Sequence, residues 1–294
     1  MAYTEYKPSD GLKGQIEAYW VRQNRPKDSA RRVYADGCAD IIVNAGPATA
    51  YFTPQADASG IIPLHTGRVY LGGTMTAYGI IRSGPGSILV GIRFRPGGLY
   101  ALYGVSMEAA VDRLIEFPDA NLLSLMATGH GMAARLDEYL GARADTRAGS
   151  GGPQHDFAGI YRAICRSGGQ VSVADLSETC HVSKRTLERI FKQNVGISPK
   201  RYIRIVRFQQ VLERLREAAP QASRQTGASA GNPRQAGVSR QTGAVSEESL
   251  LRIAYEMGYY DHAHLTNDFK QYAGLLPSEL SRFYKTGITR GQYF

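Results

Sequence analysis

The second half of the chain contains the same sequence pattern twice, and this repeat limits the possible folds more than any other feature. Residues 187–199 and 265–277 share a leucine, a Phe-Lys-Gln triplet, a glycine and a proline at identical spacing, with a constant offset of 78 residues. Self-similarity of this kind indicates one structural unit that is used twice. The match continues upstream of each copy with a slip of one residue, which a loop insertion between two helices explains.

Each copy has the pattern of two helices joined by a sharp turn. The turn is expected at His181 in the first copy and at Gly258 in the second, where glycine adopts a left-handed backbone at low cost. Ser183 and Asp261 are suitable N-caps for the helix that follows. The helix before the turn has one apolar face, formed by Val173, Leu176 and Cys180 or by Leu250, Ile253 and Met257. We therefore predict helix-turn-helix units at about 172–193 and about 249–272.

The outward side chains of these units are suited to nucleic acid. Residues 183–216 hold ten basic and two acidic side chains, so this stretch carries nearly all of the net charge of +9. Arginine pairs with guanine edges and lysine with phosphates, although a basic stretch is also typical of a solvated helix face. The predicted DNA contacts are Ser183, Lys184, Arg185, Thr186, Glu188, Arg189 and Lys192 in the first unit, Lys200, Arg201 and Arg204 after it, and Asp261, His262, His264, Thr266, Asn267 and Lys270 in the second unit.

A long helix and a low-complexity segment lie between the two units. Residues 198–218 predict one connecting helix with a stripe of Ile205, Phe208, Leu212 and Leu215. Residues 219–245 contain Ser-Arg-Gln-Thr-Gly-Ala twice and too few apolar side chains to form a core. We expect this insertion to be disordered.

The first half of the chain predicts a different architecture. Short apolar or alternating runs, separated by Gly, Pro and Asp, predict strands at 31–34, 39–44, 68–73, 78–82 and 87–94. Closely spaced strands without helices between them favour an antiparallel barrel or sandwich, followed by flanking helices. The helix expected around 131–141 would serve either dimerisation or packing against the barrel. The fold class is therefore α+β, with an N-terminal β barrel or sandwich and a C-terminal all-α domain.

Composition sets the boundaries and the broad class. The small, polar, Gly-rich stretch 144–154 predicts a linker between a regulatory domain at 1–143 and a DNA-binding domain at 155–290. Three scattered cysteines do not form a disulfide framework and favour a reducing cytoplasm. We expect neither a secretory signal nor a membrane-spanning segment.

Candidate ligand-binding residues in the first half lie on predicted strands. Strand alternation places Asp36, Cys38 and Asp40 on one face, where they form a ligand pocket or simply a packed interior. Arg93 and Arg95 also share a face, and either bind an anionic effector or form structural ion pairs. A small buried thiol is a simpler interpretation of Cys38 than a nucleophile. We predict no catalytic residue, metal site or cofactor.

The two repeated patterns resemble the AraC/XylS family of transcription regulators. The first unit reads S-x3-L-x-R-x-F-K-x3-G-x-S-P, and the second reads I-A-x3-G-Y-x-D-x2-H-L-x3-F-K-x3-G-x2-P. The resemblance covers about residues 155–286 and implies a seven-helix domain whose two units enter adjacent major grooves of DNA. The first half is similar to a regulatory domain found attached to such domains, at Tyr19-Trp20, Asp36-Gly37-Cys38, Asp40–Asn44 and Gly91–Gly98. His181, the weakly basic second unit and the 219–245 insertion depart from the usual pattern.

Three functional hypotheses follow from these observations. The first is a sequence-specific regulator of transcription that binds double-stranded DNA and responds to a small-molecule effector. The second is a regulator whose first half serves only dimerisation or protein contact, with a homodimer or RNA polymerase as the partner. The third, the least favoured, is an enzyme-like domain fused to a DNA reader.

Overall fold

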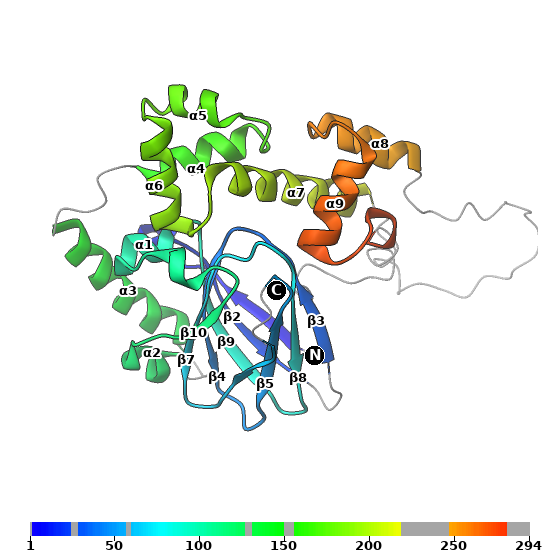
Figure 1. The fold of residues 1–294 in the computed structure, drawn as a ribbon. Coiled ribbons are helices and arrows are strands. Elements are labelled where there is room, and N and C mark those ends of the chain that lie inside the picture. The colour runs from blue at the N-terminus through cyan, green and yellow to red at the C-terminus, as the bar shows by residue number, and fades with distance from the viewer. Residues whose placement is uncertain are drawn as a thin grey trace, which may run out of the picture.

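The chain folds into a β-rich N-terminal part and a helical C-terminal part (Figure 1). The computed structural model describes residues 2–24, 29–56, 60–126, 131–149, 156–218 and 247–280. The predicted insertion at 219–245 and the end of the predicted linker lie outside the described residues. The α+β fold class is confirmed, with antiparallel sheets first and helices after them.

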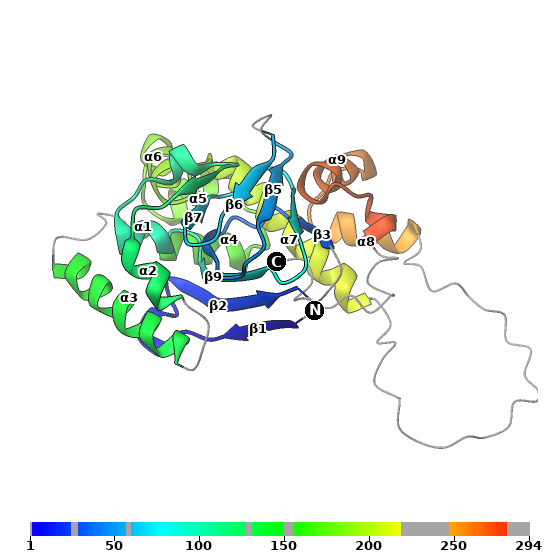
Figure 2. The same cartoon turned by 90° about the horizontal axis from the view of Figure 1, so that it is seen from below.

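The N-terminal part consists of two antiparallel sheets. The larger sheet has the order β1 (Ala2–Tyr6), β2 (Ile16–Gln23), β9 (Ile88–Phe94), β4 (Ala39–Asn44), β7 (Val69–Gly72) and β10 (Leu114–Glu116). The smaller sheet has the order β3 (Ser29–Val33), β8 (Gly79–Ser83), β5 (Ala50–Pro54) and β6 (Ile62–Leu64). Figure 2 shows β1 and β2 on one side of this arrangement.

Strand alternation divides the side chains of the larger sheet between two apolar cores. Ile41 and Val43 of β4 face the flanking helices, whereas Ile42 faces the smaller sheet together with Trp20 of β2. Trp20 pairs across the sheet with Gly91, and a Cβ at that glycine would lie 2.1 Å from the indole. The glycine in the middle of β9 therefore makes room for the only tryptophan of the chain.

Helices and 3-10 turns cover the outer face of the larger sheet. They are α1 (Gly98–Tyr103), α2 (Ala120–Leu125), α3 (Met132–Gly149) and the 3-10 turns η1 (Asp10–Leu12) and η2 (Met107–Ala110). Met132, Leu136 and Leu140 of α3 are buried in the core of this domain. This burial favours the packing interpretation of α3 over dimerisation through the same face.

The predicted start of the linker at residue 144 is wrong, because α3 continues to Gly149. Residues 144–148 include alanines and an arginine, which are good helix formers and outweigh the small polar residues between them. Arg147 also lies against Gly104, which fixes this last part of the helix to the end of α1.

The C-terminal part contains two helical units joined by a long helix. Its elements are α4 (Phe157–Arg166), α5 (Val173–Thr179), α6 (Lys184–Val195), α7 (Pro199–Ala218), α8 (Glu247–Glu256) and α9 (His262–Ala273), followed by a helical turn at 277–280. The predicted stripe of Ile205, Phe208, Leu212 and Leu215 on α7 is fully buried. Figure 1 shows α7 running between the α4–α6 group and the α8–α9 group.

The two parts share one hydrophobic core. Tyr34 and Ala35 of the N-terminal part belong to the same buried cluster as α6, α7 and α9. Gly37 has a positive φ of 78° and lies under the ring of Tyr202, where a Cβ would lie 2.5 Å from the nearest ring atom. The β domain therefore packs directly against the helical domain. None of the described helices is long and apolar enough to cross a membrane.

Candidate nucleic-acid interface and internal cavity

The first helical pair, α5 and α6, has the geometry of a helix-turn-helix unit. Ser172 caps α5 in a capping box with Asp175, and the Ser183 side chain caps α6 by accepting from the Thr186 backbone N–H. His181 in the turn has φ 53°, the left-handed conformation predicted from its place in the repeat. Local sequence signals therefore set both ends of this turn.

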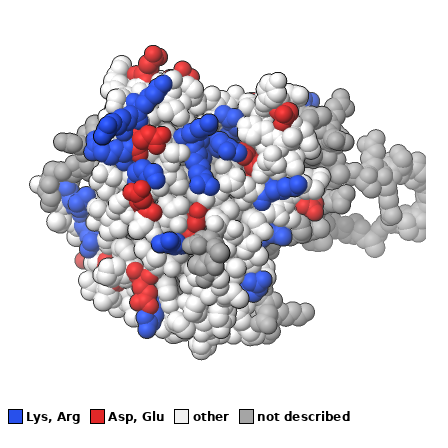
Figure 3. Space-filling view, viewed as in Figure 1, with Lys and Arg blue, Asp and Glu red and all other residues white. Residues whose placement is uncertain are grey.

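Helix α6 presents a polar and basic face to solvent. Leu187, Ile190 and Phe191 are buried against the core, so the opposite side of the helix is exposed. That exposed side carries Lys184, Arg185, Glu188, Arg189 and Lys192, with Ser183 exposed and Thr186 half-buried at its start. Figure 3 shows Lys and Arg side chains gathered over the helical part of the molecule.

The second helical pair, α8 and α9, repeats this geometry with less charge. Gly258 in the turn has φ 75°, and the Asp261 side chain caps α9 by accepting from the His264 backbone N–H at 2.7 Å. Asn267 and Lys270 are exposed, whereas His262, His264 and Thr266 are half-buried. The His264 ring packs edge-on against Tyr259, which holds this side chain beside the turn.

The basic residues at the start of α7 have two different roles. Lys200 and Arg201 are exposed. The guanidinium of Arg204 instead forms an ion pair with Asp268 of α9, a fully buried carboxylate that also accepts from the Tyr259 hydroxyl. Arg204 therefore joins α7 to the second unit, and its predicted contact with DNA stays a prediction.

One exposed lysine of α6 is paired with the N-terminal domain. Lys192 Nζ lies 3.1 Å from a carboxylate oxygen of Glu108, which belongs to η2. Close by, Gly196 at the C-cap of α6 lies against η2, where a Cβ would be 2.6 Å from the carbonyl oxygen of Met107. The N-terminal domain therefore contacts helix α6 of the first unit directly.

An internal cavity lies between the two sheets of the N-terminal domain. Its walls are mainly apolar, and its polar lining residues are Asp36, Cys38, Asp40, Arg93 and Arg113. The structure thus brings together four of the five predicted ligand-binding residues. The fifth, Arg95, does not line the cavity, because its guanidinium binds Glu17 at 2.8 Å and the backbone carbonyl of Lys13. Of the two roles predicted for Arg95, the structure favours the structural ion pair.

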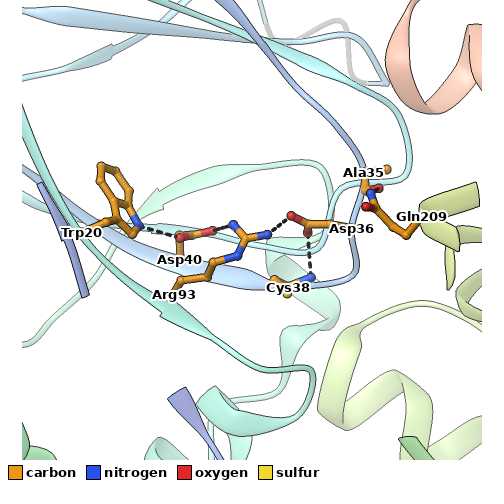
Figure 4. A network of polar contacts seen from close by, with 7 residues as sticks. All are labelled: Trp20, Ala35, Asp36, Cys38, Asp40, Arg93 and Gln209. Carbon is orange, nitrogen blue, oxygen red and sulfur yellow. Dashed lines mark hydrogen bonds and ion pairs between the residues drawn. The ribbon is translucent and has the colours of Figure 1, made fainter. Parts of the chain in front are cut away.

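The polar end of the cavity is a connected network (Figure 4). Arg93 bridges two carboxylates: one nitrogen binds Asp36 and another binds Asp40 at 3.2 Å. The second oxygen of Asp40 accepts from the Trp20 indole N–H at 3.1 Å, and Asp36 also accepts from the Cys38 backbone N–H at 2.9 Å. Burial raises the pKa of Asp40 to about 7, although the Trp20 hydrogen bond lowers it.

The cysteine in this network is poorly suited to nucleophilic chemistry. Burial raises the pKa of the Cys38 thiol well above its usual range, and the neighbouring Asp40 raises it further. A thiol is reactive mainly as the thiolate, so this environment keeps Cys38 in its inert form. Among the described residues, no group of three or more His, Cys, Asp or Glu side chains is arranged to hold a metal ion.

Comparisons with known proteins match both parts of the chain. Residues 167–204, which comprise the first helix-turn-helix unit, match the family described as bacterial regulatory helix-turn-helix proteins, AraC family. This segment of the chain is an AraC-family helix-turn-helix domain. Residues 4–116 match a family described as a domain of unknown function (DUF6597), so the N-terminal domain is of a recurrent type.

Individual proteins are also similar to parts or most of this chain. An uncharacterized HTH-type transcriptional regulator from Haemophilus influenzae is 29% identical over 107 residues, which are 36% of this chain and 26% of the relative. The match therefore spans about a quarter of the length of that relative. A structure of ToxT from Vibrio cholerae with bound unsaturated fatty acid has a TM-score of 0.47 and 13% identity, covering 92% of this chain and 97% of ToxT. A structure of the AraC-like transcriptional activator CuxR has a TM-score of 0.32 and 14% identity, covering 65% of this chain and 76% of CuxR.

The sequence analysis missed two residues that hold the helix-turn-helix units in place. Asp268 lies on the inward face of α9, between Leu265 and Phe269. A carboxylate at a position where the helix pattern expects an apolar residue indicates a buried ion pair, and this signal was present in the sequence. Glu108 gave no such signal, because its partner Lys192 is 84 residues away in sequence.

Proposed function

We propose that this AraC-family protein is a sequence-specific transcription regulator that binds double-stranded DNA through α6 and α9. The observation that carries the proposal is the exposed basic face of α6, on the second helix of a complete helix-turn-helix unit. In such units the second helix enters the major groove and its side chains reach the base edges.

Each group on this surface has a distinct proposed role. Arg185 and Arg189 read bases, because a guanidinium forms two hydrogen bonds with a guanine edge. Lys184, Lys192, Lys200 and Arg201 bind phosphates and fix the orientation of the protein on the duplex. In the second unit Asp261 caps α9, as Ser183 caps α6 in the first. The weaker or more sequence-dependent DNA contacts of this unit are made by His262, His264, Thr266, Asn267 and Lys270.

The first experiment is DNA binding by the full chain across a salt series. We expect binding to the DNA upstream of its own coding sequence to exceed binding to random DNA by at least about a hundredfold at equal salt. Equal and steeply salt-dependent binding to both would indicate a general polyanion binder. Absence of binding to either DNA would contradict the proposed function.

Substitution of single arginines tests base reading. Arg185→Ala or Arg189→Ala is expected to weaken specific binding by about 1–3 kcal/mol and to relax specificity at one base pair. Arg68→Ala is the matched control, because Arg68 pairs with Glu116 in the N-terminal domain and lies outside the helix-turn-helix units. An equal loss of affinity for specific and random DNA would count against base reading.

An effector response through the internal cavity is the second part of the proposal. A concave site with apolar walls and a few convergent polar groups is typical of small-molecule binding, and Asp36, Cys38, Asp40 and Arg93 provide those groups. The alternative, an N-terminal domain that serves only dimerisation or contact with a protein such as RNA polymerase, predicts no ligand-dependent change in stability or DNA affinity. A catalytic activity that is lost on Cys38→Ala or Asp36→Ala would instead favour an enzyme-like domain.

A further inference from the structure

The two helix-turn-helix units touch each other directly, in addition to their packing on α7. Residues 168–170, in the loop that leads into α5, meet the turn at 256–258 of the second unit. The side-chain amide of Gln170 donates to the backbone carbonyl of Glu256 at 3.0 Å. A Cβ at Gly258 would lie 3.3 Å from the Gln170 side chain, so the loop and the turn are in van der Waals contact.

Arg207 of α7 binds both of these segments. Its Nε donates to the carbonyl of Gly169 at 2.9 Å, and its Nη1 donates to the carbonyl of Gly258 at 3.0 Å. Gly169 allows this close approach, because a Cβ there would lie 2.6 Å from the backbone nitrogen of Arg207. One planar guanidinium therefore holds a carbonyl from each unit. We call the five bonded residues the inter-unit bridge, namely Gly169, Gln170, Arg207, Glu256 and Gly258.

The other contacts of the second unit attach it to α7 alone. Phe208 of α7 packs edge-on against Phe269 of α9, with 5.1 Å between the ring centres, and Arg204 binds Asp268. Apolar packing is non-directional, so it holds α9 near α7 but restricts rotation about α7 less than directional hydrogen bonds do. The bridge adds a second attachment, to the first unit, and two attachments fix an orientation.

The covalent connection between the two units contributes little to their relative placement. Residues 219–246 separate α7 from α8 in the sequence. A connection of this length restricts the two ends that it joins only weakly. Noncovalent contacts therefore have to set the position of the second unit.

The relative orientation of the two units matters because DNA is itself a helix. One turn of B-DNA contains about 10–10.5 base pairs over about 34–36 Å. Each added base pair therefore moves the next half-site by about 3.4 Å and rotates it by about 35°. Two units held in one orientation engage two half-sites at one spacing only, whereas units that rotate relative to each other accept neighbouring spacings as well.

We propose that the inter-unit bridge sets the spacing between the two DNA half-sites that this protein accepts, with Gln170 and Arg207 as positioning residues. In this role neither side chain reads a base. Both hold α6 and α9 in the orientation in which the two helices enter adjacent major grooves. This inference rests on the proposed function, because it takes α6 and α9 as the helices that read DNA.

A second role of Arg207 has to be separated from the first. Arg207 lines a surface groove of about 450 Å³ together with Lys200, Arg204 and His264. A cation in this groove can also bind a DNA phosphate. Arg207→Lys separates the two roles, because lysine keeps the charge but lacks the planar fork that reaches both carbonyls. Gln170→Ala is an independent variant, because Gln170 is uncharged and exposed.

The test measures the affinity of the full chain for DNA with altered spacing. A fragment that the original protein selects from a random-sequence pool supplies the parent spacing, and footprinting locates its two half-sites. One base pair is then inserted between them. The original protein is expected to lose at least about tenfold in affinity, because the base contacts of one unit are lost. Arg207→Lys and Gln170→Ala are each expected to reduce this loss to about threefold or less, with an unchanged salt dependence.

Arg214→Lys is the matched control. Arg214 is exposed on α7, about two turns beyond Arg207. This variant is expected to keep the original loss of affinity on insertion. Thermal unfolding of each variant measures the stability of the fold separately, so a lower Tm with unchanged discrimination between spacings would indicate a purely structural role for the bridge.

A distance measurement between α6 and α9 tests the bridge without DNA. Spin labels carried by unnatural amino acids at the exposed positions Glu188 and Asn267 report the separation of the two helices by pulsed electron paramagnetic resonance. The original protein is expected to give one narrow distribution of distances. The distribution is expected to be at least about 1.5-fold broader in Arg207→Lys and in Gln170→Ala, because loss of a local contact permits hinge motion.

Three results would overturn the inference: an original protein that tolerates the inserted base pair, a bridge variant that keeps the full loss of affinity on insertion, or equal distance distributions in the original protein and both variants. Weaker binding of Arg207→Lys by the same factor at every spacing belongs to the second result and would assign Arg207 to phosphate binding alone. Failure to bind any DNA would contradict the proposed function, whereas the distance distributions would still show whether the bridge holds the two units.

Discussion

The carboxylate of Asp268 shows how one residue fixes the second helix-turn-helix unit to the connecting helix. It is fully buried and bound by the Arg204 guanidinium and the Tyr259 hydroxyl, so its charge is compensated from α7 and from the turn before α9. A buried charge that is paired in this way stabilises one arrangement of the helices, because any other arrangement leaves it unpaired.

We predict that Asp268→Ala lowers the free energy of unfolding by about 2–4 kcal/mol, since the guanidinium loses its partner at a partly buried site. The measurement is urea unfolding of the full chain. The control is Glu213→Ala, whose pair with Arg216 is partly exposed on α7 and should change stability by less than about 1 kcal/mol. Similar effects of the two substitutions would show that Asp268 has no special structural role.

The buried carboxyl of Asp40 leads to a prediction about how stability depends on pH. Its pKa rises from 3.8 to about 7 in the folded protein because of burial, with Trp20, Arg93 and Arg22 as the facing groups. The folded state therefore keeps a proton that the unfolded state releases between about pH 4 and 7, so stability falls as pH rises through this window. Unfolding curves from pH 5 to 8 should show this fall, and Asp40→Asn should reduce it. If the stability of the variant falls with pH as steeply as that of the original protein, the fall does not come from Asp40.

At the scale of elements, the recognition helix α6 is held by η2 of the N-terminal domain. The Lys192–Glu108 pair occupies a lysine that we assign to phosphate binding, so the pair competes with DNA. An exposed ion pair of this kind contributes less than about 1 kcal/mol of free energy to the conformation in which it forms.

We predict that Glu108→Gln tightens DNA binding by up to about fivefold, because a free energy of less than about 1 kcal/mol corresponds to that ratio. Fluorescence anisotropy of labelled upstream DNA measures the change. The control is Glu116→Gln, which removes the partner of Arg68 in the N-terminal domain. This substitution should leave the affinity for DNA unchanged. Weaker DNA binding by the Glu108 variant would show that the pair supports the binding conformation.

Elements with strong local signals were predicted well. The strand at 39–44 and the caps at Ser183 and Asp261 lie where the sequence placed them. Strands β1, β2, β5, β6 and β10 were not predicted, and two of them contain only three residues, too few for alternation to be recognised. Their formation depends on hydrogen bonds to strands that are distant in sequence.

At the scale of the whole molecule, one buried cluster joins α6, α7 and α9 with the loop at Tyr34 and Ala35. The described ends of the helical domain at Ala218 and Glu247 are both attached to this cluster through α7 and α8. The Ser-Arg-Gln-Thr-Gly-Ala repeats in the sequence between these ends carry few apolar side chains that could add to the cluster.

We predict that deletion of residues 221–244 changes the Tm by less than about 3 °C, since loop length affects closure entropy only weakly. Thermal unfolding followed by circular dichroism tests this, and DNA binding by the same variant shows whether the two units still act together. A much larger loss of Tm would show that the segment has a structural role.

The sequence by itself determined the helix-turn-helix units, their caps and the apolar faces of α6 and α7. These features depend on interactions within a few residues, which periodicity and turn chemistry report directly. Only the tertiary structure decided that Arg204 binds Asp268, that Glu108 meets Lys192, and that Asp36, Asp40 and Arg93 line one cavity. Those contacts join residues far apart in the chain, and packing of the whole molecule fixes them, so no local pattern encodes them.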